Sequence, residues 1–187
     1  MILGITGTIG AGKGTVVDYL VKEKGFTHYS VRDAISEEIL KRGLEVNRVN
    51  MNEVATDLRH TNVPEYYTTI FMERAKKGGV DSYIMESIRN VREAENIKAH
   101  GGFLLAVDAP EATRYERIQA RASATDNVSL EEFKAQEARE MTSENPSDPS
   151  FMNMRAVMDM ADAIITNNST LDELHVQIEE VLRKIGK

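Results

Sequence analysis

Residues 1–24 read Met-Ile-Leu-Gly-Ile-Thr-Gly-Thr-Ile-Gly-Ala-Gly-Lys-Gly-Thr-Val-Val-Asp-Tyr-Leu-Val-Lys-Glu-Lys. The apolar run over residues 2–6 predicts a buried strand, and the pattern from about residue 12 to residue 24 predicts a helix. A loop rich in glycine joins the two. A strand that passes through such a loop directly into a helix is typical of the start of an α/β chain.

The loop itself carries the most specific motif in the sequence. Gly7 is followed by four residues, then by Gly12 and Lys13, which is the spacing of a phosphate-binding P-loop. Glycines let successive backbone N–H groups point at one anion, and the N-terminus of the helix adds positive potential. Lys13 is expected to reach the β- and γ-phosphates of a nucleotide. The predicted ATP phosphate-binding residues are Gly7, Thr8, Ile9, Gly10, Ala11, Gly12, Lys13, Gly14 and Thr15. The alternative is a glycine-rich turn with an incidental lysine, which the flanking strand and helix make the weaker interpretation.

Strands and helices alternate along the rest of the chain. Further strands are expected at about 27–29, 82–88, 103–107 and 163–166. Helices are expected at about 32–42, 51–60, 64–77, 90–100, 110–121, 129–142, 152–160 and from 170 onward. This alternation predicts a three-layer α/β/α fold in which helices cover both faces of a central five-stranded parallel sheet. With 187 residues, the chain is expected to form a single domain.

Composition excludes several classes of function. The net charge is −7, which argues against general binding to nucleic acids or anionic membranes. No apolar run is long enough to span a bilayer, and the N-terminus lacks the features of a signal peptide. There are no cysteines, and the four histidines show no ligand spacing. These features predict a cytoplasmic protein without a metal cage, whose partners are small molecules.

By its P-loop and the order of its later motifs, the chain resembles the nucleoside monophosphate kinase group of P-loop proteins. That group includes adenylate kinases and dephospho-CoA kinases. The resemblance runs from the first strand to the last helix, and implies ATP as phosphoryl donor with Mg²⁺ as cofactor. The sequence Gly-Lys-Gly-Thr at 12–15 is similar to that of adenylate kinases, where the metal is held mostly through water and phosphates. Thr15 is therefore expected to touch a phosphate or a metal-bound water.

Two later segments supply candidate catalytic residues. Glu86 and Arg89 end a predicted strand and resemble the Asp-Gly-x-Pro-Arg segment of adenylate kinases, without the proline and one residue shorter. The resemblance implies that Glu86 holds a magnesium-bound water and that Arg89 clamps the acceptor phosphate. Arg117 and Arg121 lie four residues apart on one helix face, with Arg114 a turn earlier, and resemble the arginines that open the lid of adenylate kinases. For both segments, surface ion pairs are the alternative interpretation.

The acceptor side is expected in the helices over about 31–77. Asp33 resembles the start of the monophosphate-binding helix, and Arg32 or Arg59 could replace the arginine expected at position 36. An N-cap for Asp33 and surface charge for Arg59 are equally good explanations.

A small helical lid is expected over about 122–150, with Arg139 as a candidate lid arginine. Asn167 and Asn168 resemble the loop that frames adenine in dephospho-CoA kinases, and an N-cap cluster explains them as well.

The sequence predicts transfer of the γ-phosphoryl group of ATP to a small phosphorylated acceptor. A (deoxy)nucleoside monophosphate is favoured, because only one aspartate follows the second strand where dephospho-CoA kinases usually carry two. Dephospho-CoA kinase and a non-catalytic nucleotide-binding regulator stay open as alternatives. A GTPase is disfavoured because no Asn-Lys-x-Asp motif is present. An AAA-type ATPase is expected to need a longer chain and a fuller Walker B motif. Oligomeric state is not predicted.

Overall fold

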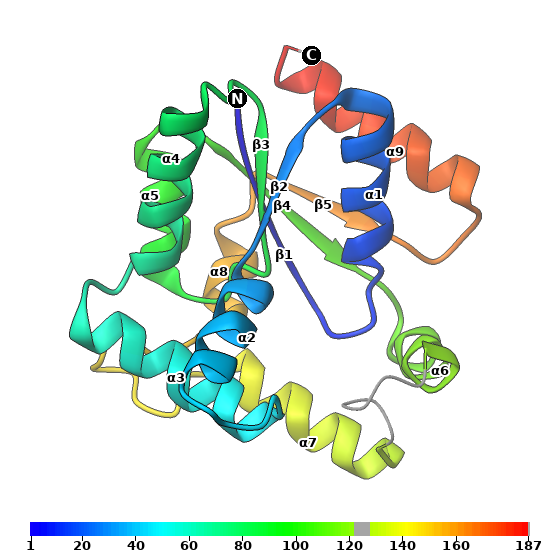
Figure 1. Cartoon of the computed structure of the whole chain (residues 1–187). Coiled ribbons are helices and arrows are strands. Elements are labelled where there is room, and N and C mark those ends of the chain that lie inside the picture. Colours follow the sequence, from blue (N-terminus) through cyan, green and yellow to red (C-terminus); the bar gives the residue numbers. More distant parts are fainter. Residues whose placement is uncertain (122–127, 187) are drawn as a thin grey trace.

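The computed structural model describes residues 1–121 and 128–186, and these residues form one parallel sheet (Figure 1). The strands are β1 (Ile2–Gly7), β2 (Thr27–Ser30), β3 (Tyr83–Glu86), β4 (Phe103–Asp108) and β5 (Ala163–Thr166). Their order across the sheet is β2-β3-β1-β4-β5, and every neighbouring pair is parallel. The predicted five-stranded parallel sheet is confirmed, with the P-loop strand β1 at its centre.

Helices cover both faces of this sheet, as predicted. They are α1 (Lys13–Lys24), α2 (Val31–Lys41), α3 (Arg48–Thr61), α4 (Tyr66–Gly78), α5 (Val91–Ala99), α6 (Glu111–Arg121), α7 (Leu130–Met141), α8 (Met154–Asp159) and α9 (Leu171–Lys184). Helices α1 and α9 lie on one face, and α4, α5 and α8 lie on the other (Figure 1). Leu20 and Ile178 pack in the first buried cluster and Phe71 and Ile97 in the second. The fold is therefore the three-layer α/β/α sandwich expected from the alternation of elements.

Two element boundaries differ from the sequence expectation for identifiable reasons. Strand β3 was expected to continue to Ile88 but ends at Glu86, because Ser87 adopts a left-handed backbone conformation with φ 69°. A hydrogen bond of 2.7 Å from Oγ1 of Thr6 to the Ile88 carbonyl holds the chain beyond the strand. Helix α3 begins three residues before the expected Met51, because Asn47 caps it through its side chain. The segment that follows β3 is therefore held beside the end of β1, where the P-loop begins.

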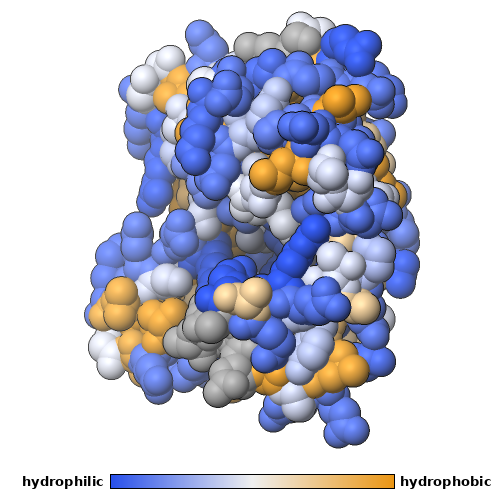
Figure 2. Space-filling view, turned by 90° about the vertical axis from the view of Figure 1, so that its right-hand side faces the viewer, coloured by the Kyte–Doolittle hydropathy of each residue, from blue (hydrophilic) through white to orange (hydrophobic). Residues whose placement is uncertain are grey.

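The carboxyl ends of the strands face a second group of helices. Helices α2, α3 and α7 lie beyond this edge of the sheet, and α6 lies next to it (Figure 1). The surface between these helices and the sheet is hollowed, with hydrophilic residues around the hollow (Figure 2). Ligands of open parallel sheets bind at this edge. None of the helices in the described residues is long and apolar enough to cross a membrane.

Candidate active site

The P-loop has the backbone geometry that its glycines predict. Gly7 has φ 134°, and a Cβ atom placed there would lie 1.9 Å from the carbonyl oxygen of Val107. Gly12 has φ 91°, and its Cβ would lie 2.2 Å from Nδ2 of Asn167. Position 7 therefore requires glycine both for its conformation and for space, because its neighbour is backbone, whereas position 12 requires it for its left-handed conformation. Helix α1 begins at Lys13, and Lys13 and Gly14 at its N-terminus line the cavity, where the positive end of the helix dipole favours an anion.

Lys13 is turned back onto the loop. Its Nζ donates hydrogen bonds of 2.9 Å to the carbonyl oxygens of both Gly7 and Thr8. The pKa of Lys13 is lowered to about 8, first by desolvation and then by the positive charge of Arg89, while Glu86 and Glu140 act in the opposite direction. A lysine crowded in this way has a strong electrostatic preference for a polyanion beside it.

Two side chains support the loop from the β5 side. Nδ2 of Asn167 donates a hydrogen bond of 2.9 Å to the carbonyl oxygen of Ala11. Nη1 of Arg117 donates one of 3.0 Å to the Asn167 carbonyl. Both residues were expected at the ATP site, and the structure brings them together behind the P-loop, outside the residues that line the cavity. Asn168 is exposed.

Two further contacts fix the start of the loop. Oγ1 of Thr8 donates a hydrogen bond of 2.6 Å to Asp108 at the end of β4. Nη1 of the buried Arg114 donates one of 3.3 Å to the Ile9 carbonyl. Arg114 also forms a two-pronged ion pair with Glu137 of α7, so it connects the P-loop to that helix. Asp108 was not predicted from the sequence, although it ends the strand β4, which pairs with β1.

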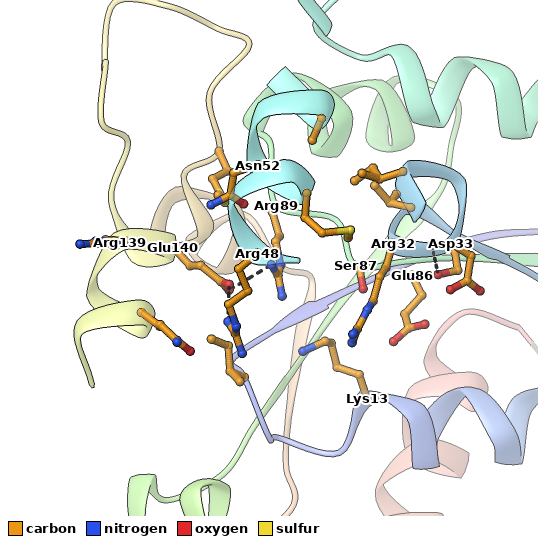
Figure 3. A pocket seen from close by; sticks show the side chains of 18 of the residues that line it. Lys13, Arg32, Asp33, Arg48, Asn52, Glu86, Ser87, Arg89, Arg139 and Glu140 are labelled. Carbon is orange, nitrogen blue, oxygen red and sulfur yellow. Dashed lines mark hydrogen bonds and ion pairs between the residues drawn. The ribbon is translucent and has the colours of Figure 1, made fainter. Parts of the chain in front are cut away.

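A cavity of about 410 Å³ extends from the P-loop to α2, α3 and α7 (Figure 3). Seven of the residues singled out in the sequence on the acceptor, catalytic and lid sides line it: Arg32, Asp33, Arg59, Glu86, Arg89, Arg121 and Arg139. The side chains of Arg32, Arg89 and Lys13 point into it, whereas the guanidinium group of Arg139 points away (Figure 3). The expected lid begins in residues 122–127, which lie outside the described residues, and its helical part is α7.

Glu86 lies on the floor of this cavity. Its Oε2 is 3.0 Å from Nε2 of His28, a partner on β2 that the sequence analysis did not identify. Burial alone would raise the pKa of Glu86, but the hydrogen bond from His28 and the charges of His28, Lys13 and Arg89 outweigh it, and the pKa lies below its usual value. Glu86 is therefore an ionised carboxylate. Ser87 beside it carries the left-handed backbone strain often found at functional sites.

A magnesium ion would have few protein ligands here. Within the described ranges, no three His, Cys, Asp or Glu side chains come together as a metal site. The ionised carboxylate of Glu86, together with nucleotide phosphates, would form a donor set of the kind that holds Mg²⁺, whereas Thr15 is not among the residues that line the cavity. The residues present thus fit a metal that arrives with the nucleotide. Thr15 is half-buried.

Two residues that the sequence analysis did not identify meet in the cavity. Oε1 of Glu140 lies 3.5 Å from Nη1 of Arg48, and its Oε2 lies 3.1 Å from Nη1 of Arg89 (Figure 3). The Glu140 side chain is 9% exposed. Glu140 follows Phe133, the buried anchor of α7, by seven residues, so helical spacing already indicated its inward direction.

Arg59 has a buried partner of its own. Its Nε donates a hydrogen bond of 2.9 Å to Glu93, and its guanidinium group lies over the ring of Tyr67. Burial raises the pKa of Glu93, and Arg59 opposes that rise. The two side chains are 5% and 0% exposed, so the pair belongs to the wall of the cavity.

The sheet order, the P-loop on β1 and the cavity at the carboxyl edge define a P-loop protein with the fold of small-molecule kinases. More particularly, the chain belongs to the AAA domain family, whose sequence pattern matches residues 3–145. The exclusion of an AAA-type protein on grounds of length and Walker B motif was therefore wrong at the level of family. The family model matches a chain of this size, and the acid at the end of β3 is Glu86.

The most similar curated proteins include members named UPF0200. UPF0200 protein TK1334 of Thermococcus kodakarensis is 28% identical over 99% of this chain and 98% of its own. A UPF0200 protein of Sulfurisphaera tokodaii is 28% identical over 98% of this chain and 97% of its own.

Solved structures share the fold over the whole chain. TT1252 from Thermus thermophilus matches with a TM-score of 0.63 and 23% identity, covering 100% of this chain and 98% of that one. Shikimate kinase from Bacteroides thetaiotaomicron matches with a TM-score of 0.63 and 11% identity, covering 100% and 99%.

Proposed function

We propose that the protein transfers the γ-phosphoryl group of ATP to a small phosphorylated acceptor, with a (deoxy)nucleoside monophosphate as the acceptor class. The proposal rests on one observation: Lys13 of the P-loop and the inward-pointing Arg32 and Arg89 line the same cavity. In this reading, residues 1–187 form one kinase domain, the helices over about 31–77 bind the acceptor, and the segment over about 122–150 serves as a lid.

In the proposed reaction, positioning and charge neutralisation supply the catalysis. The backbone N–H groups of the P-loop hold the β- and γ-phosphates, and Lys13 follows the charge as the phosphoryl group moves. Arg89 and Arg121 stabilise the transferring group and the acceptor phosphate. Magnesium, held by Glu86 and Thr15 through water, would neutralise charge on the nucleotide phosphates. Because a monophosphate oxygen is already anionic near neutral pH, no general base is needed.

A second candidate is transfer to the ribose hydroxyl of dephospho-CoA. Asp33 lines the same cavity, and Ser30 accepts a hydrogen bond of 3.1 Å from its backbone N–H, which leaves the carboxylate available. A hydroxyl acceptor must lose a proton, and a carboxylate in this position could accept it.

A coupled assay with Mg·ATP tests both candidates. The acceptor panel contains nucleoside and deoxynucleoside monophosphates, dephospho-CoA, and shikimate, the last because shikimate kinases share the fold. Turnover with a monophosphate supports the proposal, and turnover with dephospho-CoA alone replaces it with the second candidate. ATP binding without turnover on any acceptor would favour a non-catalytic nucleotide-binding regulator.

A further inference from the structure

Helix α7 is attached to the site through two carboxylates on one face. Glu137 pairs with Arg114, which also binds the P-loop carbonyl of Ile9. Glu140, three residues later, lies between Arg48 and Arg89. The first contact joins α7 to the donor side of the cavity, and the second places a negative charge among the arginines of the acceptor side.

The contact of Glu140 with Arg89 is incomplete. The two groups form an ion pair at 3.1 Å, but the pair lacks hydrogen-bond geometry. Oε2 of Glu140 is buried and accepts no hydrogen bond among the described residues. Nε of Arg89 is also buried, and within the same part of the chain it donates none. An arginine that binds a phosphate or carboxylate ligand commonly does so through two parallel N–H···O hydrogen bonds from its guanidinium group. Glu140 therefore balances the charge of Arg89 but leaves the hydrogen-bonding capacity of its Nε unused.

The position of Glu140 on its helix is unfavourable by itself. It is the penultimate residue of α7, where the negative end of the helix dipole repels a carboxylate. Within the described residues, its ion pairs with Arg48 and Arg89 oppose that repulsion. The backbone of Arg89, in contrast, is fixed, because the Asn153 N–H donates a hydrogen bond of 2.8 Å to its carbonyl and Asn90 binds the carbonyls of Pro149 and Phe151. If a ligand enters, Glu140 is the group that can leave.

We propose that Glu140 is an internal substitute for the acceptor's anionic group, which a phosphate monoester must displace from Arg48 and Arg89 before it can bind. This inference rests on the proposed function and narrows its substrate class. A phosphate monoester carries nearly two negative charges at neutral pH and three acceptor oxygens, so it can engage both arginines more fully than one carboxylate can. A carboxylate ligand would exchange one carboxylate for another with little gain. Glu140 thus selects phosphorylated acceptors over carboxylate-bearing ones.

Calorimetric titration of inorganic phosphate tests this displacement. The P-loop is first saturated with Mg·AMP-PNP, so that the added phosphate can bind at Arg48 and Arg89 but not at the P-loop. Glu140→Gln should bind phosphate at least about tenfold more tightly than the unmodified protein, the effect of about one charge-assisted contact. Glu131→Gln makes the same change of charge at an exposed position of α7 and should leave the phosphate Kd unchanged. Adding Arg89→Gln to Glu140→Gln should abolish the gain.

Three outcomes would overturn the inference. They are an unchanged phosphate Kd in Glu140→Gln, an equal gain in Glu131→Gln, and acetate binding to Glu140→Gln as tightly as phosphate. If Glu140→Gln does not fold, Glu140→Asp retains the charge on a shorter side chain and should show a smaller gain, whereas no gain there would count against displacement. The titration requires no phosphoryl transfer. A gain in phosphate affinity without turnover on any acceptor would therefore contradict the proposed function but not this inference. Turnover without the gain in phosphate affinity would contradict this inference but not the proposed function.

Discussion

Nζ of Lys13 donates a hydrogen bond of 2.9 Å to the carbonyl oxygen of Thr8, and an equal one to that of Gly7. The ammonium group is thus held by the backbone of the loop that it is proposed to serve. It is also crowded by the charge of Arg89. Its present partners are neutral carbonyl oxygens, whereas a triphosphate would offer it negatively charged oxygens.

Replacing Lys13 tests its proposed role in transfer. Lys13→Ala removes two hydrogen bonds and a desolvated charge but no apolar packing, so the free energy of unfolding should change by less than about 1 kcal/mol. The value of kcat on the best acceptor should fall at least about a hundredfold. Lys22→Ala, an exposed lysine on the same helix, is the matched control. An unchanged kcat in Lys13→Ala would contradict the mechanism.

The pH dependence of nucleotide binding follows from the lowered pKa of Lys13. Below about pH 8 the lysine of the free protein is protonated, and above it the lysine is neutral. Because binding favours the charged form, the Kd of an ATP analogue should rise above pH 8, by up to about tenfold per pH unit. Fluorescence titration from about pH 6.5 to about pH 9.5 measures this Kd. In Lys13→Ala the rise should disappear, and a Kd in the unmodified protein that stays flat across that range would show that Lys13 does not titrate there.

Two glycines of the P-loop differ sharply in the space around them. A Cβ at Gly7 would collide with the Val107 carbonyl, whereas a Cβ at Gly14 would meet nothing within 4 Å. Gly7→Ala should therefore destabilise the protein by at least about 2 kcal/mol. Gly14→Ala, inside helix α1, should be neutral or stabilising by up to about 1 kcal/mol. Denaturant unfolding followed by circular dichroism compares the two, and equal effects would contradict the described loop geometry.

The buried pair of Arg59 and Glu93 separates a structural role from an acceptor-binding role. Arg59→Ala leaves the buried Glu93 carboxylate uncompensated and should cost about 3–5 kcal/mol of stability. The double variant Arg59→Met with Glu93→Leu removes both charges and should recover most of that loss. If Arg59 only supports the wall, the double variant keeps the acceptor KM of the unmodified protein. A KM that rises at restored stability would instead assign Arg59 to the acceptor.

Local patterns predicted the fold and the position of the P-loop between β1 and α1. The strand, the spacing of Gly7, Gly12 and Lys13, and the following helix all lie within about one supersecondary unit, so sequence periodicity and turn chemistry determine them together. The helix expected from about residue 129 is present as α7, and a capping box of Ser129 and Glu132 closes its N-terminus. The end of β3 was missed because the left-handed Ser87 is imposed by contacts with β1, which local propensity does not contain.

The acceptor side depended on contacts between distant segments. His28 reaches Glu86 across two neighbouring strands, and Arg48 reaches Glu140 over 92 positions of sequence. On α7 the sequence analysis singled out Arg139 for its charge, whereas the neighbouring Glu140 faces the cavity (Figure 3). Glu140 lies seven residues after the buried Phe133, which indicated that both side chains point to the same side of α7. A carboxylate is nevertheless uncommon at a buried position unless a charged partner faces it. That partner could be found only in three dimensions.

The central claim is that the loop from Gly7 to Thr15 holds the triphosphate of ATP next to Lys13. A crystal structure with Mg·AMP-PNP tests it most directly. We expect the β- and γ-phosphates within hydrogen-bond distance of the loop N–H groups, with Nζ of Lys13 moved from the Gly7 and Thr8 carbonyls onto phosphate oxygens. Nucleotide bound elsewhere, or Nζ still on those carbonyls beside an ordered triphosphate, would contradict the account.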